Sequence, residues 1–79
     1  MHFYEYKEHT IYPTPRILLD TGHWKIQLTI RYKNKLKIFT HDLQFNTQGE
    51  AVFHSISYGK KLIDEGIEFD REVHQANGK

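Results

Sequence analysis

The 79-residue chain contains no cysteine, which excludes disulfide bridges and thiolate metal sites. Its longest aliphatic run is Ile17-Leu18-Leu19, far short of the roughly 20 apolar residues that a membrane-spanning helix needs. The first residues, MHFYEYKEH, carry charges and tyrosines where a signal peptide requires an apolar stretch. These absences predict a cytoplasmic protein that does not contact a membrane.

The chain is also too short for several classes of enzyme. A protein of this size buries only about 60% of its unfolded surface, which leaves room for one sheet and one helix but not for a deep substrate cleft. A hydrophobic content of 38%, with 14% aromatic residues, is nevertheless enough for a core. We expect a single domain over residues 1–74 with a disordered tail at 75–79. We expect no enzyme activity, no cofactor and no small-molecule substrate.

Two segments alternate with the period of a half-buried strand. In residues 24–32 every even position is large and apolar or aromatic, and every odd position is polar. Residues 36–40 continue the alternation, with a turn at 33–35. A three-residue loop there sets Ile30 opposite Ile38, whereas a two-residue loop would set Ile30 opposite Lys37 and bring a lysine into the core. The requirement that the apolar side chains of both strands share one face therefore favours the three-residue loop.

An earlier hairpin is predicted around Gly22, because glycine adopts the positive φ angle that tight turns require. With Thr21 and Gly22 as the loop, Leu19 pairs with Trp24 and Ile17 with Ile26. Pro13 and Pro15 cannot donate to a strand ladder, so this first strand is an edge. The aromatic residues 3–12 are expected to extend it. The two alignments predict an inner face made of Ile17, Leu19, Trp24, Ile26, Leu28, Ile30, Leu36 and Ile38.

The helix signal is the strongest in the chain. Thr47 followed by Glu50 is a capping box, and an apolar stripe through Val52, Ile56, Gly59 and Ile63 comes directly after it. Glycine in mid-helix costs about 1 kcal/mol against alanine, which indicates a close contact with the sheet at Gly59. Gly66 is a helix stop, and Phe69 and Val73 are candidates for a short extra element. The predicted fold is α+β: a three-stranded antiparallel sheet, with an extra N-terminal strand segment, packed on one C-terminal helix.

Charge is unevenly distributed along the chain. Residues 16–41 hold six bases against one acid (6 − 1 = +5), although the whole chain has a net charge of +1. Basic and amide side chains on an exposed sheet can neutralise phosphates and reach base edges, and an exposed aromatic ring can stack on an unpaired base. A merely solvated face is the alternative. The predicted nucleic-acid-binding residues are Arg16, Lys25, Gln27, Thr29, Arg31, Lys37 and Phe39.

Two motifs carry a resemblance to known domains. Residues 22–25, Gly-His-Trp-Lys, and residues 45–51, Phe-Asn-Thr-Gln-Gly-Glu-Ala, make residues 16–64 similar to plant AP2-type and integrase-arm DNA-binding domains. The chain resembles equally the small uncharacterised bacterial proteins built as β-β-β-α units. The first resemblance implies a sheet that enters the major groove, with arginines and tryptophans of its outer face on DNA. By position it implies contacts from Lys25, Gln27, Thr29, Arg31 and Lys37.

The six histidines give no metal-site pattern, because no pair has the H-x-x-x-H spacing of a helical zinc site. We therefore expect surface histidines and no metal. The neighbours His54 and Ser55, and Lys60 and Lys61, do not face one another on a helix, so they predict no catalytic pair.

Self-association is the alternative function. A small sheet with one helix leaves one face open, and two copies that join edge strands would bury surface that a monomer exposes. Because lysine is depleted from interface cores, the basic outer face favours edge pairing over face-to-face packing. The predicted route is a homodimer through the N-terminal edge strand.

Overall fold

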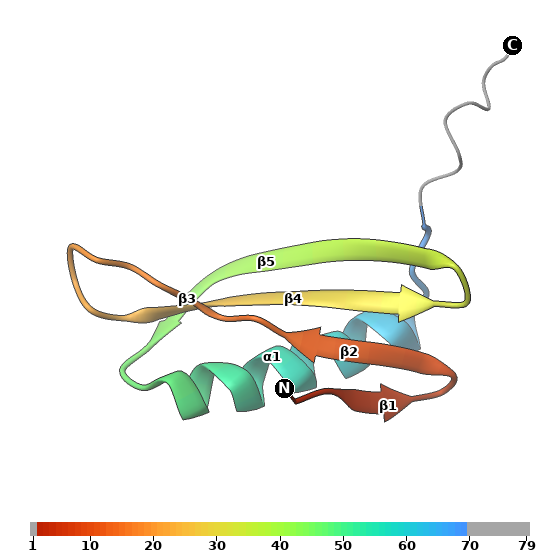
Figure 1. The fold of residues 1–79 in the computed structure, drawn as a ribbon, viewed down its shortest axis with the longest axis horizontal. Helices are drawn as coiled ribbons and strands as arrows, with labels where there is room; N and C mark the ends of the chain where they lie inside the picture. Colours follow the sequence, from red (N-terminus) through yellow and green to blue (C-terminus); the bar gives the residue numbers. More distant parts are fainter. Residues whose placement is uncertain (1, 70–79) are drawn as a thin grey trace, which may run out of the picture.

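A computed structural model describes residues 2–69, which form a twisted antiparallel sheet with one helix packed across it (Figure 1). The predicted end of the domain at residue 74, the element with Val73 and the tail at 75–79 lie outside the described residues. The elements are β1 (Tyr4–Tyr6), β2 (His9–Pro13), β3 (Arg16–Ile17), β4 (Trp24–Tyr32), β5 (Lys35–Phe45) and α1 (Gln48–Glu65).

Strand β4 is the centre of the sheet. On one side it pairs with β2, which in turn pairs with β1, and further along the same side it pairs with the short β3. On its other side it pairs along most of its length with β5. The predicted α+β class, with an antiparallel sheet and one C-terminal helix, is confirmed, and the N-terminal aromatic segment does join the sheet. The sheet has five strands rather than three because this segment folds into the hairpin β1–β2.

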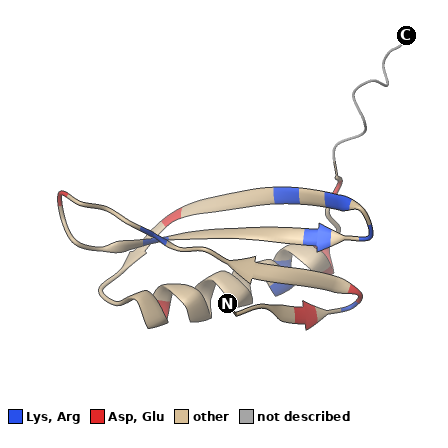
Figure 2. Ribbon diagram, viewed as in Figure 1, with Lys and Arg blue, Asp and Glu red and all other residues tan. Residues whose placement is uncertain are grey.

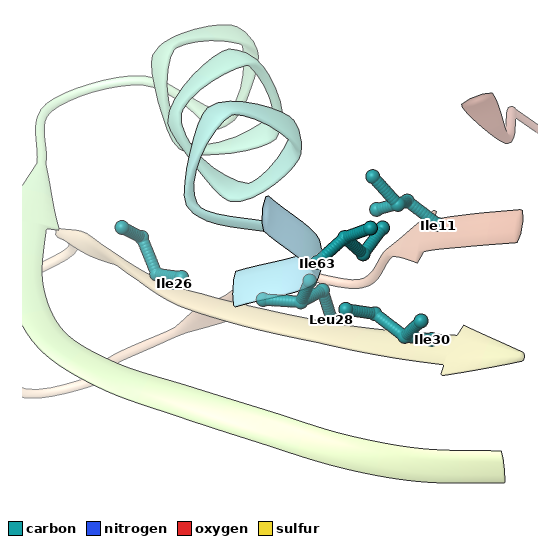
Figure 3. Close-up of a cluster of buried hydrophobic side chains, with 5 residues drawn as sticks. All are labelled: Ile11, Ile26, Leu28, Ile30 and Ile63. Carbon is teal, nitrogen blue, oxygen red and sulfur yellow. The ribbon is translucent and has the colours of Figure 1, made fainter. Parts of the chain in front are cut away.

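The core lies between the sheet and α1. Ile26, Leu28 and Ile30 extend from one side of β4 toward the helix, as the alternation predicts, and Ile11 of β2 joins them (Figure 3). Ile63 of α1 completes this cluster of buried side chains. The helix covers the middle of the sheet, so the side chains of β4 and β2 are buried most completely.

The helix begins as predicted. The Thr47 hydroxyl accepts a hydrogen bond from the Glu50 N–H, while the Glu50 carboxylate accepts one from the Thr47 N–H. This reciprocal pair satisfies two backbone donors that the first turn leaves unpaired. The helix ends at Gly66, whose φ is 96° and whose N–H donates to the carbonyls of Leu62 and Ile63.

The buried side of α1 is rotated by about one position from the predicted stripe. Ala51, Ser55, Gly59 and Ile63 are buried, whereas Val52 and Ile56 lie at its flank, half-buried. Small residues at three of the four buried positions let the helix lie close to β4.

The predicted register of the β4–β5 hairpin is wrong. Lys33 and Asn34 form a two-residue loop, so Tyr32 pairs with Lys35 and Ile30 with Lys37. The loop is possible because Lys33 adopts a φ of 57°, and the favoured two-residue hairpin loops require a positive φ at their first position. The shift by one residue exchanges the two faces of β5. Leu36 and Ile38 therefore lie on the outer face instead of in the core.

The first hairpin also differs from its prediction. Ile17 pairs with Trp24 rather than with Ile26, and the loop spans residues 18–23, with the Leu18 N–H bonded to the His23 carbonyl at 2.8 Å. The predicted core residue Leu19 is 89% exposed in this loop, and Ile17 of β3 is 43% exposed. The displacement follows from β2, which sets the register for both strands: Pro13 pairs with Leu28, and Arg16 pairs with Lys25 three residues further along. The Thr14 N–H donates to the Gln27 carbonyl between them, so the register continues unchanged past the prolines.

The β1–β2 turn is tied to the end of the helix. The Tyr6 hydroxyl donates to both Asp64 carboxylate oxygens, at 3.0 and 3.1 Å, and Lys7 Nζ lies 2.7 Å from Asp64 Oδ1. The hydrogen bond from Lys7, and then that from Tyr6, lowers the pKa of Asp64, while the hydrogen bond to Asp64 raises the pKa of Lys7. This contact holds the outermost strand against the helix.

Candidate nucleic-acid interface

The face of the sheet opposite α1 is covered by no element of the described chain. We call it the open face. Side chains directly opposite each other in an antiparallel pair share a face, so the register defines its members. The predicted residues Arg16, Lys25, Gln27, Thr29 and Arg31 lie on it together.

Lys37 and Phe39 do not belong to this set, which corrects their predicted role. Phe39 packs against the core cluster, paired with Leu28, and Lys37 extends toward the helix side, where Nζ donates to the Glu68 carbonyl at 3.0 Å. His41 also lies on the helix side of the sheet, where its ring packs edge-on against Tyr58 with 5.1 Å between the ring centroids. The two-residue loop is the cause, because it turns odd positions of β5 inward.

The charged side chains of the open face differ in how freely they can meet a ligand. Lys25 Nζ lies 3.6 Å from an Asp42 carboxylate that is almost fully exposed. Arg31 donates from Nε to the Lys33 carbonyl at 3.3 Å, while the Gln27 amide donates to the Thr14 hydroxyl at 3.3 Å. The Arg31 side chain is thus oriented at one end of the open face without a carboxylate partner among the described residues.

Four cations gather around the β4–β5 turn. Arg31, Lys33, Lys35 and Lys37 occur in seven residues with no acid between them. Figure 2 shows Lys and Arg, in blue, gathered at the end of the sheet where β4 and β5 join. We call residues 31–37 the basic hairpin. Its Arg31 side belongs to the open face, and its Lys37 side belongs to the helix face. The basic hairpin therefore extends the positive field of the open face around the tip of the sheet.

A hollow of about 790 Å³ extends from the β4–β5 turn past residues 13–15 to the first turns of α1. Tyr12, Thr29, Arg31 and Leu36 line it from the open face, Lys33 from the turn, and Val52 from the start of the helix. The wall combines hydroxyls and a guanidinium with apolar side chains. Such a lining suits a flat ring next to a phosphate.

Several open-face residues were not predicted from the sequence. Thr10 and Tyr12 of β2 pair with Arg31 and Thr29, and the ring centroids of Tyr12 and Phe3 lie 6.0 Å apart. Strand β5 adds Leu36, Ile38 and Thr40 in place of Lys37 and Phe39. A two-residue loop at residues 33–34 would have predicted the three residues of β5. The sequence argued against that loop because it brings Lys37 to the same face as Ile30.

Three histidines are engaged in aromatic packing. His9 stacks on Tyr32 at 4.4 Å between ring centroids, and His54 stacks on Phe45 at 4.4 Å. His41 packs edge-on against Tyr58. Within residues 2–69 no three histidine, aspartate or glutamate side chains come together in a way that could hold a metal ion.

Comparisons of the chain with protein-family models, with curated proteins and with solved structures give no match. The resemblance to AP2-type domains and to bacterial β-β-β-α proteins stays a prediction. Within the described part of the chain, the helix is not apolar enough to span a bilayer.

Proposed function

We propose that this chain is a small nucleic-acid-binding module that uses its open face together with the basic hairpin. The observation that carries the proposal is the row of side chains along β4. Lys25, Gln27, Thr29 and Arg31 follow one another at every second residue on a face that no described element covers, and Arg16 lies beside Lys25.

The dimensions of this row fit a short nucleic-acid site. Six residues of extended strand separate Arg31 from Lys25, which spans about 20 Å, or about six nucleotide steps of one duplex strand. The cations would neutralise phosphates, while the amide and hydroxyl groups between them are of the kind that reads base edges. Tyr12 and Phe3, at the side of this row, supply ring surface for stacking on an unpaired base.

The expected affinity depends strongly on salt. If about four phosphates are neutralised, the logarithm of the binding constant for duplex DNA falls with the logarithm of salt concentration with a slope of about −3.6. Between about 50 and 200 mM salt this amounts to a loss of about 100-fold. The measurement is fluorescence anisotropy with labelled single-stranded DNA, single-stranded RNA and duplex DNA at these two concentrations.

Two charge-matched variants separate a site from general attraction. Arg31→Gln removes a cation from the open face, and Lys61→Gln removes one from the exposed side of α1. We expect Arg31→Gln to weaken binding by about five- to tenfold and to reduce the salt slope by about one, because it removes one phosphate contact. Lys61→Gln should change binding less than about twofold. Equal effects of the two variants, or binding that does not depend on salt, would contradict the proposal.

A further inference from the structure

Strand β5 is a long sheet edge. It runs over 11 residues, Lys35–Phe45, and within the described chain its backbone pairs with β4 alone. The opposite edge, β1, has 3 residues. A long exposed edge strand is a template for another strand, since it presents a row of unpaired N–H and C=O groups.

The register shows which backbone groups of β5 point away from the sheet. In a hairpin with a two-residue loop the flanking residues, here Tyr32 and Lys35, form a hydrogen-bonded pair, and such pairs then alternate with non-bonded ones. The Thr14 N–H donates to the Gln27 carbonyl at 2.8 Å, so the Gln27 backbone faces β2 rather than its β5 partner, Thr40. The outward-directed backbone groups are those of Leu36, Ile38 and Thr40.

Two of these residues also expose large apolar side chains. Leu36 is 63% exposed and Ile38 is 66% exposed, next to each other on the open-face side of the edge. An inward-pointing lysine is a common guard of an edge strand, and Lys37 has that position. Its ammonium group, however, is bonded to the Glu68 carbonyl and lies 5.7 Å from the centre of the Phe39 ring, under the sheet. It therefore leaves the edge itself accessible.

We infer that β5 pairs antiparallel with β5 of a second copy of this chain, with the two-fold axis at Ile38. The register against β4 is regular from Lys35 to His41 and then shifts, because Ile26 pairs with His41 but Lys25 with Gln44. The regular segment 35–41 has Ile38 at its middle. Pairing about this residue uses the outward groups of Leu36, Ile38 and Thr40 in both copies, with about six backbone hydrogen bonds.

The side chains are complementary in this arrangement. Ile38 meets its own symmetry mate, and Leu36 faces Thr40 of the second copy. Lys35 faces His41 of the second copy, and Asp42 of that copy is the next residue along the strand. The end of each β5 strand that carries Lys35 therefore lies beside the end of the other strand that carries Asp42. The two-fold axis runs perpendicular to the sheet. Both helices therefore stay on one side, and the two open faces form one continuous surface.

The contact is small. Seven residues a side is well below the roughly 20–30 residues a side of a standard stable interface, so we expect a weak dimer that forms in the micromolar-to-millimolar range. Sedimentation equilibrium without nucleic acid should show the mass rising above the 9.5 kDa of one chain over this range. Because nucleic acid is absent, the outcome is independent of the proposed binding function.

A matched pair of substitutions tests the location. Ile38→Lys places two like charges on the axis, and Leu19→Lys makes the same exchange in the 89% exposed loop at the far end of the sheet. We expect Ile38→Lys to stay monomeric at about 1 mM and Leu19→Lys to associate like the parent chain. Circular dichroism checks that both variants fold. A parent chain that stays monomeric at about 1 mM, or a dimer that Ile38→Lys does not weaken, would overturn the inference.

The chain contains no cysteine, so a single introduced cysteine reports on the register. Ile38→Cys brings two sulfurs together with Cα atoms about 5.5 Å apart, which is within the range of a disulfide. In Leu36→Cys the two introduced cysteines lie four residues apart along the paired strands, a distance of about 13 Å. We expect oxidative cross-linking at least about tenfold faster for Ile38→Cys than for Leu36→Cys. Equal rates, or a faster Leu36→Cys, would refute pairing about Ile38.

Discussion

Gly59 lies where α1 comes closest to the sheet. A Cβ atom at this position would be 2.9 Å from Leu28 Cδ1 and 3.0 Å from Ile11 Cδ1. Both of these side chains are completely buried, so neither can move aside into solvent. The mid-helix glycine predicted a close helix–sheet contact, and the structure identifies its partners. The cost in helix propensity is offset by the closer packing that the missing side chain permits.

We predict that Gly59→Ala destabilises the protein by about 1 kcal/mol, because overpacking of about 1–3 kcal/mol exceeds the gain in helix propensity. The control is Gly49→Ala in the first turn of the same helix, where a Cβ would meet no atom within 4 Å. That variant should gain up to about 1 kcal/mol. Urea unfolding of both variants measures the difference. Equal stabilisation by the two alanines would contradict the close contact.

The hairpin β1–β2 is attached to the rest of the molecule at two places. Along its length β2 pairs with β4, and at its turn Tyr6 and Lys7 bond to Asp64 in the last turn of α1. Lys60 adds its ammonium group, 4.4 Å from the centre of the Tyr4 ring. The N-terminal strand thus depends on the helix for a contact that joins residues nearly sixty positions apart.

This contact should make stability depend on pH. The folded state lowers the pKa of Asp64, so the contribution is present above the ordinary carboxyl pKa of about 4 and is lost as the pH falls through the lower folded value. It raises the pKa of Lys7, so the contribution is present below about 10.4 and is lost as the pH rises through the higher folded value. The pair therefore stabilises the fold between these limits.

We predict that Asp64→Asn lowers the thermal midpoint at neutral pH by a small amount, since the pair is exposed. The difference from the parent chain should disappear in acid, as the pH falls through the lowered pKa of Asp64. Glu65→Gln is the control, because Glu65 is the neighbouring exposed carboxylate and makes no ion pair within residues 2–69. Calorimetry from acid to neutral pH gives the comparison. A difference that persists in acid would rule out the ion pair as its cause.

At the scale of the whole molecule, the sheet divides the chain into a covered side and an open side. One helix can cover only the middle of a five-stranded sheet, so burial is concentrated on β4 and β2. Strand β5 lies at the margin of the helix. It contributes Phe39 and Phe45 to the core as half-buried rings and leaves Leu36 and Ile38 exposed. The open face therefore combines cations from β4 with apolar side chains from β5.

Ile38 reports which side of β5 is covered, and the buried Ile30 of β4 serves as the reference. We predict that Ile30→Ala costs about 2–5 kcal/mol, as expected for a fully buried side chain, whereas Ile38→Ala costs less than about 0.5 kcal/mol. Urea unfolding at low protein concentration keeps self-association out of the comparison. A large loss for Ile38→Ala would instead favour the three-residue loop.

The class of fold and the strongest local features of this protein follow from its sequence alone. The alternation over residues 24–32 assigned both faces of β4, because a strand with a period of two separates them unambiguously. The capping box placed the start of the helix, since Thr47 and Glu50 satisfy each other's backbone groups without help from the rest of the chain. Four of the seven predicted binding residues lie on the open face for the same local reason: Lys25, Gln27, Thr29 and Arg31 occupy alternate positions of β4.

The buried face of β5, in contrast, depends on contacts between elements that lie far apart in the sequence. Residues 35–45 carry apolar side chains on both faces of the strand. Leu36 and Ile38 lie on the open face, and Phe39 and Phe45 lie on the helix side. A period of two identifies two faces but does not say which one meets the helix. That choice depended on a two-residue loop with Lys33 in a left-handed conformation and on how far α1 extends across the sheet. The same choice moved Lys37 and Phe39 off the open face and left the edge at Ile38 exposed.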